Sequence, residues 1–108
     1  MIRQKFKGWV QERTELFQNE GIATEFAMPD VDIELLAKPF VKIIQETKVC
    51  MGQVIVYKSR EMDFEIIHIE TEELLLWKYF ESIDDDVDFN LILTEYFYIL
   101  KSGIKSIQ

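Results

Sequence analysis

Four apolar, strand-like runs follow one another between residues 40 and 80, with only short polar breaks between them. The runs are 40–46 (FVKIIQE), 50–58 (CMGQVIVYK), 62–70 (MDFEIIHIE) and 73–80 (ELLLWKYF), and they are rich in the β-branched and aromatic residues that strands prefer. Breaks this short fit hairpin turns, so the sequence predicts an antiparallel meander.

A helix is predicted before these runs, over residues 2–19, where apolar side chains recur at about the 3.6-residue helical period. Those side chains are Phe6, Trp9, Val10, Leu16 and Phe17. Gly21 follows, at a position where glycine readily adopts the left-handed conformation that ends a helix. From Ile22 to Met28 the apolar period changes to two, which predicts a further strand that Pro29 ends.

A second helix is predicted after the meander, over residues 86–101. Its apolar stripe consists of Phe89, Ile92, Leu93, Tyr96, Phe97, Ile99 and Leu100. Asp84-Asp85-Asp86 is expected to supply its N-cap and to place negative charge at the positive end of the helix dipole. Ser102-Gly103 is expected to close it.

These elements predict one α+β domain over residues 1–108, with an N-terminal helix, a five-strand antiparallel meander-like sheet and a C-terminal helix. Both helices are expected to pack on one face of the sheet. Residues 29–39 are interpreted as a connecting loop with a possible turn of helix.

Both faces of the predicted sheet are apolar near the middle. In the last run, Leu74 and Leu76 are expected to point one way and Leu75 and Trp77 the other. Two helices cover one face only, so the other face requires residues 29–39, another subunit or a partner protein. We therefore expect a two-fold homodimer unless residues 29–39 fold over that face.

The charge balance excludes several classes of function. Twelve Lys and Arg against twenty Asp and Glu give a formal net charge of −8, whereas nucleic acids and anionic membranes require a basic surface. One cysteine and one histidine cannot form an internal disulfide or the usual four-ligand zinc site. No secretory signal and no stretch of about 20 apolar residues is present, so a cytoplasmic location is expected.

No arrangement of residues points to catalysis, a cofactor or a metal. His68 and Glu70 could form a dyad, but a half-buried strand histidine bonded to a neighbour is the favoured interpretation. Cys50 is interpreted as a small buried apolar residue. The aspartates at 84–86 and 88 lack the central glycine of a calcium loop, so helix capping is favoured over cation binding.

Acidic residues are concentrated in one part of the chain. Between Glu61 and Glu95 there are twelve acids and a single base, Lys78. A localised acidic surface suits docking to a basic partner, although a surface that serves only solubility remains the alternative. The predicted partner-binding carboxylates are Glu61, Asp63, Glu65, Glu70, Glu72, Glu73, Asp84, Asp85 and Asp86, with Tyr57, Trp77 and Tyr79 as aromatic anchors.

The carboxylates are expected to form separate rims, because turns 58–61 and 70–73 lie at opposite ends of one shared strand. The rim of Glu70, Glu72 and Glu73, or the corner at residues 84–86, is the preferred docking point.

The order of several segments resembles the TriTu-type immunity proteins of contact-dependent growth inhibition and polymorphic toxin systems. The segments are Phe6-Lys7-Gly8-Trp9-Val10, the run from Met51 to Tyr57, the run from Met62 to Ile66, residues 71–77, and the Asp-rich opening of the last helix, Asp86-Val87-Asp88-Phe89 through Leu93.

This resemblance implies a non-catalytic inhibitor of a delivered toxin domain, expected to be an RNase acting on tRNA that works with elongation factor Tu. An acidic inhibitor can occupy the basic substrate cleft of an RNase by mimicking a phosphate backbone. The alternatives are an acidic adaptor for another basic protein and a small enzyme that uses His68.

Overall fold

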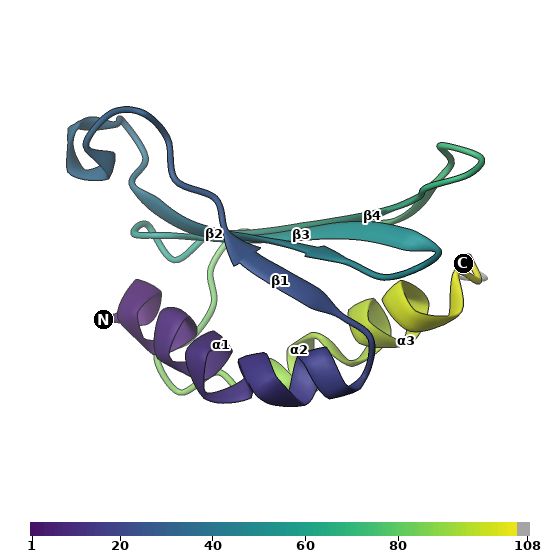
Figure 1. Ribbon diagram of the computed structural model, residues 1–108. Coiled ribbons are helices and arrows are strands. Elements are labelled where there is room, and N and C mark those ends of the chain that lie inside the picture. The colour runs from purple at the N-terminus through teal and green to yellow at the C-terminus, as the bar shows by residue number, and fades with distance from the viewer. Residues whose placement is uncertain (106–108) are drawn as a thin grey trace.

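The computed structural model describes residues 1–105, which form a five-stranded antiparallel sheet in the order β1-β2-β3-β4-β5 with helices on one side of it (Figure 1). The predicted α+β architecture and meander are confirmed. The elements are α1 (Ile2–Asn19), β1 (Ala23–Phe26), the 3₁₀ turn η1 (Ile33–Leu35), β2 (Phe40–Glu46), β3 (Cys50–Tyr57), β4 (Met62–His68), β5 (Leu74–Phe80), α2 (Phe89–Ile92) and α3 (Thr94–Ser102).

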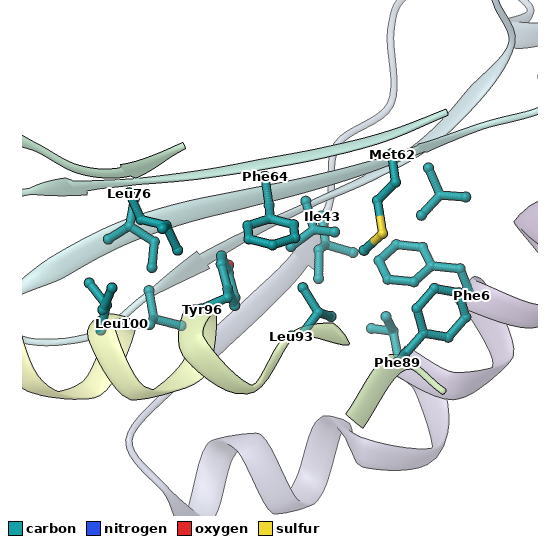
Figure 2. Packing of buried hydrophobic residues seen from close by; sticks show 14 of the residues in the cluster. Phe6, Ile43, Met62, Phe64, Leu76, Phe89, Leu93, Tyr96 and Leu100 are labelled. Carbon is teal, nitrogen blue, oxygen red and sulfur yellow. The ribbon is translucent and has the colours of Figure 1, made fainter. Parts of the chain in front are cut away.

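The core lies between the sheet and the helices. Apolar side chains from one face of the sheet pack there against apolar side chains from the inner sides of α1, α2 and α3 (Figure 2). These are the apolar faces that the strand and helix periods of the sequence predict. The side chains that meet include Phe6, Ile43, Met62, Phe64, Leu76, Phe89, Leu93, Tyr96 and Leu100. Burial of this apolar surface is the main favourable contribution to folding.

The C-terminal helical segment differs from the single helix predicted over 86–101. It is broken at Leu93, whose backbone (φ −101°, ψ 13°) separates α2 from α3. The hydroxyl of Thr94 donates to the carbonyl oxygens of Asn90 and Leu91 at 2.9 and 2.8 Å, and so satisfies acceptors at the break.

The predicted N-cap was also wrong. Asp88 caps α2, because its carboxylate accepts hydrogen bonds from the backbone N–H groups of Asn90 and Leu91. Residues 84–86 lie too early in the chain to reach those groups. Gly103 ends α3 in the left-handed conformation (φ 71°), as predicted.

A bulge between Ile66 and Ile67 changes the sides on which the leucines of β5 lie. Leu74 pairs with Ile67 and Leu76 pairs with Ile66, so these two leucines lie on opposite faces and not on the shared face predicted for them. Leu75 and Leu76 are both buried, whereas Leu74 and Trp77 are exposed.

Residues 29–39 do not cover the second sheet face. Figure 1 shows this segment, with η1, rising beyond one end of the sheet on the side away from the helices. The turn between β4 and β5 rises on the same side at the opposite end. The face between them stays uncovered, since Met51, Ile67 and Trp77 are all exposed.

Candidate protein-binding surface

The uncovered sheet face, called the open face below, combines carboxylates with large apolar and aromatic side chains. Its members on β3, β4 and β5 follow from the alternation of side chains along each strand and from the strand register. They are Met51, Gln53, Ile55, Tyr57, Asp63, Glu65, Ile67, Leu74, Trp77 and Tyr79.

The register places each open-face carboxylate of β4 directly beside an aromatic residue of β5. Asp63 pairs with Tyr79, and Glu65 pairs with Trp77. Trp77 is 59% exposed and Tyr79 is 45% exposed. Exposed aromatic side chains next to polar groups are typical of the centres of protein interfaces.

Glu61, at the start of this acidic row, is held by three donors. The hydroxyl of Tyr79, the ammonium of Lys38 at 3.0 Å and the hydroxyl of Ser59 at 2.7 Å all donate to its carboxylate. These hydrogen bonds lower the pKa of Glu61 to about 2. Glu61 is therefore a fixed negative charge that positions the exposed ring of Tyr79.

Asp63 and Glu65 are less fully compensated. The amide of Gln53 donates to Glu65 at 3.0 Å. Partial burial, together with the neighbouring charge of Glu65, raises the pKa of Asp63. The raised pKa shows that the negative charge of Asp63 is poorly stabilised beside that of Glu65. A positively charged group that approached these two carboxylates would stabilise both charges.

The other predicted carboxylates lie apart from the open face. Glu70, Glu72 and Glu73 lie in the β4–β5 turn, at the opposite end of β4 from Glu61, as predicted. Glu73 is bonded there by Lys105 at 3.1 Å. The three glutamates of this turn thus form a separate rim at the edge of the open face.

Residues 84–86 form a third group, in the segment that descends from β5 to the helix layer (Figure 1). The carboxylate of Asp85 accepts a hydrogen bond from Arg60 at 2.6 Å, and its carbonyl oxygen accepts one from Lys5 of α1 at 2.7 Å. These bonds tie the corner to α1 and to the β3–β4 turn.

Sequence comparison identifies the family. The model of the family described as Immunity protein TriTu matches residues 4–99, which is most of the chain. This chain belongs to the TriTu immunity protein family. No curated protein and no solved structure matches it.

Immunity proteins act by binding a cognate toxin, so the TriTu family gives this chain a class of partner. Five of the residues that the sequence predicted for partner binding lie on the open face, and Glu61 stands at its end. The five are Tyr57, Asp63, Glu65, Trp77 and Tyr79.

The sequence did not single out Gln53 as a partner of Glu65, or Lys38 and Ser59 as partners of Glu61. The alternation of side chains along β3 was sufficient to place Gln53 on the same face as Glu65. The positions of Lys38 and Ser59 next to Glu61 depend instead on how two loops fold back.

His68 and Cys50 have structural surroundings in this TriTu protein. His68 is half-buried at the end of β4, and its Nδ1 accepts a hydrogen bond from the backbone N–H of Thr71 at 3.4 Å. Cys50 is fully buried, and its thiol donates to the carbonyl oxygen of Ile99 at 3.6 Å. Burial raises the pKa of the Cys50 thiol, which disfavours the reactive thiolate.

Within residues 1–105, no group of three or more His, Cys, Asp or Glu side chains is arranged to hold a metal ion. Over the same residues, no helix is long and apolar enough to cross a membrane.

Proposed function

We propose that this immunity protein neutralises a nuclease toxin, acting on tRNA, by docking its open face on the basic substrate cleft of the toxin. The observation that carries this proposal is the pairing of Asp63 with Tyr79 and of Glu65 with Trp77 on a sheet face that nothing in residues 1–105 covers. The carboxylates supply charge in place of nucleic-acid phosphates, and the rings supply apolar contact area.

Charge complementarity also suits the task of an antidote. Free toxin must be captured before it turns over substrate, and electrostatic steering raises association rates to about 10⁸–10⁹ M⁻¹s⁻¹ at low salt. The rim of Glu70, Glu72 and Glu73 borders the open face and extends the attracting field beyond the contact itself. The complex is proposed to form in the cytoplasm, where tRNA and elongation factor Tu are found, and elongation factor Tu is a proposed third component.

The test is co-expression and co-purification with the toxin domain encoded by the adjacent reading frame, followed by measurement of both rate constants. Reversal of the two open-face charges in Asp63→Lys/Glu65→Lys is expected to weaken the complex by about 2–5 kcal/mol, because desolvated charge pairs are lost. Glu12→Lys/Glu15→Lys on α1 makes the same change in net charge and is the matched control.

Far-ultraviolet circular dichroism and urea unfolding establish that both double variants are folded. Equal affinity of the two variants for the toxin would show that the open face does not dock. In that case the acidic surface serves solubility, and the proposal fails.

We also propose that the protein has no catalytic activity. His68 lies at the end of β4 and bonds a neighbouring backbone group. Its register partner on β3, Cys50, is fully buried, and its thiol is bonded to the carbonyl oxygen of Ile99. His68→Ala is expected to leave toxin affinity within about tenfold, which is about 1.4 kcal/mol. A substrate that the wild type turns over and His68→Ala does not would establish an enzyme instead.

A homodimer is a second proposal for the free protein, because exposed Trp77, Met51 and Ile67 share the uncovered face. Sedimentation velocity at micromolar concentration is expected to show a dimer that the toxin dissociates, since both partners use this face. A single species of about 13 kDa over that concentration range contradicts this proposal.

A further inference from the structure

A groove with a basic rim lies between α1 and the segment that leads from β1 to β2. Its volume is about 560 Å³, which is within the range of binding pockets. Its floor is apolar, with Phe26, Met28, Ile33, Phe40 and Val41, and basic side chains of Arg3, Lys7 and Lys42 line it. In Figure 1 this is the end of the sheet where α1 begins and the segment with η1 rises.

The positive charge of this groove is only partly compensated. Arg3 bonds to Glu34 at 2.8 Å, so these two charges cancel. Lys7 lies over the ring of Phe26, 5.9 Å from its centroid. Within residues 1–105, no carboxylate lies within 4.0 Å of the ammonium of Lys7 or of Lys42. Two positive charges therefore stand beside an apolar floor, in a chain whose formal net charge is −8.

The groove is continuous with the open face. Lys42 pairs with Ile55 across β2 and β3, and Ile55 pairs with Asp63 across β3 and β4. Two strand spacings, about 10 Å, thus separate the basic edge of the groove from the acidic row. A standard interface covers about 800 Å² on each partner, so one docked protein reaches both.

We propose that the groove binds a segment of the same toxin in which an apolar side chain stands next to an aspartate or glutamate. This inference rests on the proposed function of the open face, and it adds a second contact of opposite charge. The apolar side chain enters among Phe26, Met28 and Ile33, and the carboxylate pairs with Lys7 and Lys42. A protein surface of uniform positive charge is repelled at this point, so the groove selects the cognate toxin among basic proteins.

The test measures dissociation of the toxin domain encoded by the adjacent reading frame from variants of this chain. Lys7→Glu and Lys42→Glu are each expected to speed dissociation by about tenfold or more, because each leaves the toxin carboxylate facing a like charge. Lys48→Glu, at an exposed position in the β2–β3 turn, makes the same change in charge and is expected to have little effect.

A second pair of variants tests whether an apolar side chain of the toxin enters the groove. Met28, which is 70% exposed in the groove, and Leu35, which is 81% exposed outside it, are each changed to serine. Met28→Ser is expected to weaken the complex several-fold and Leu35→Ser to leave it unchanged. Both positions are solvent-exposed, so neither change removes core packing.

Three outcomes overturn the inference. Dissociation from Lys7→Glu and Lys42→Glu at the rate found for Lys48→Glu shows that the groove is not in the interface. An effect of the lysine reversals on dissociation without any effect of Met28→Ser shows that no apolar side chain of the toxin enters the groove. A change in self-association with unchanged toxin binding makes it a contact between copies of this chain. Failure of the proposed docking of the open face can be distinguished from failure of this inference, because the Asp63→Lys/Glu65→Lys variant tests the open face alone.

Discussion

The hydroxyl of Tyr96 on α3 packs against the backbone of Gly52 on β3, where a Cβ atom would approach the hydroxyl oxygen to 2.5 Å. This close approach lets the hydroxyl donate a hydrogen bond at 3.0 Å to Gln45, which is fully buried on β2. The amide of Gln45 in turn donates to the hydroxyl of Thr24 on β1 at 2.9 Å. A continuous polar chain therefore joins the helix layer to the edge strand.

Gly52→Ala is expected to destabilise the fold by about 1–3 kcal/mol, as overpacking does in a tight core. The added methyl group would also lie 3.0 Å from Tyr96 Cζ and 3.1 Å from Leu100 Cδ1, so little room exists for relaxation. Urea unfolding of the wild type, Gly52→Ala, Tyr96→Phe and the double variant Gly52→Ala/Tyr96→Phe measures this effect.

In a Tyr96→Phe background the same substitution is expected to cost less, because the closest atom is gone. Tyr96→Phe alone should cost about 1–3 kcal/mol, since it leaves the buried Gln45 carbonyl oxygen without a donor. Strictly additive effects of the two substitutions would contradict the described contact.

Asp88→Ala is expected to lower the unfolding free energy by about 0.5–2 kcal/mol, because it removes the acceptor for two N–H groups at the start of α2. Asp86→Ala removes an equal charge from an exposed position two residues earlier and serves as the control. Thermal or urea unfolding distinguishes them. Equal destabilisation by both would mean that charge near the helix, and not the cap hydrogen bonds, is responsible.

Glu61→Gln is expected to flatten the pH dependence of stability in acid. The pKa of Glu61 is lowered from 4.5 to about 2 in the folded protein. A carboxylate with a lowered pKa stabilises the fold above its unfolded value, and this contribution is lost as the pH falls through the folded value. The wild type should therefore lose more stability than Glu61→Gln between pH 4.5 and about 2.

Urea unfolding midpoints measured between pH 4.5 and about 2 test this expected loss of stability, with Tyr79→Phe as a second variant. Because the Tyr79 hydroxyl is the largest cause of the low pKa of Glu61, its loss should leave an intermediate pH dependence. Parallel curves for wild type and Glu61→Gln would show that Glu61 is not held as described.

Trp77→Ala is expected to weaken the toxin complex by about 2 kcal/mol or more, as loss of an aromatic anchor does. Tyr98→Ala is the matched control, because Tyr98 is 58% exposed, against 59% for Trp77, and lies on α3, on the helix side of the sheet. Both variants should stay within about 1 kcal/mol of wild-type stability. Equal toxin affinity for the two would remove Trp77 from the interface.

The strand periods predicted the sheet closely because each period follows from local geometry. The run at 40–46 coincides with β2, and the run at 50–58 exceeds β3 by one residue. The alternation also placed Asp63 and Glu65 on one face, since successive side chains of a strand point to opposite sides. The order of the elements and the alternation of side chains along β3 and β4 were thus determined by the sequence alone.

Two predictions failed where several local solutions compete. Four aspartates precede the last helical segment, and only the folded backbone selects Asp88 as the cap. Three consecutive leucines begin the last strand, and the bulge at Ile66 and Ile67 decides which of them face the core.

Tertiary structure alone decided which surfaces remain open. The sequence predicted that two helices cannot cover both sheet faces, but only the path of residues 29–39 leaves the face of Trp77 uncovered. The same path brings Ile33 and Glu34 to the groove that Lys7 of α1 and Lys42 of β2 also line. Contacts between residues this far apart depend on how loops fold back over packed elements, and no periodicity of the chain encodes them.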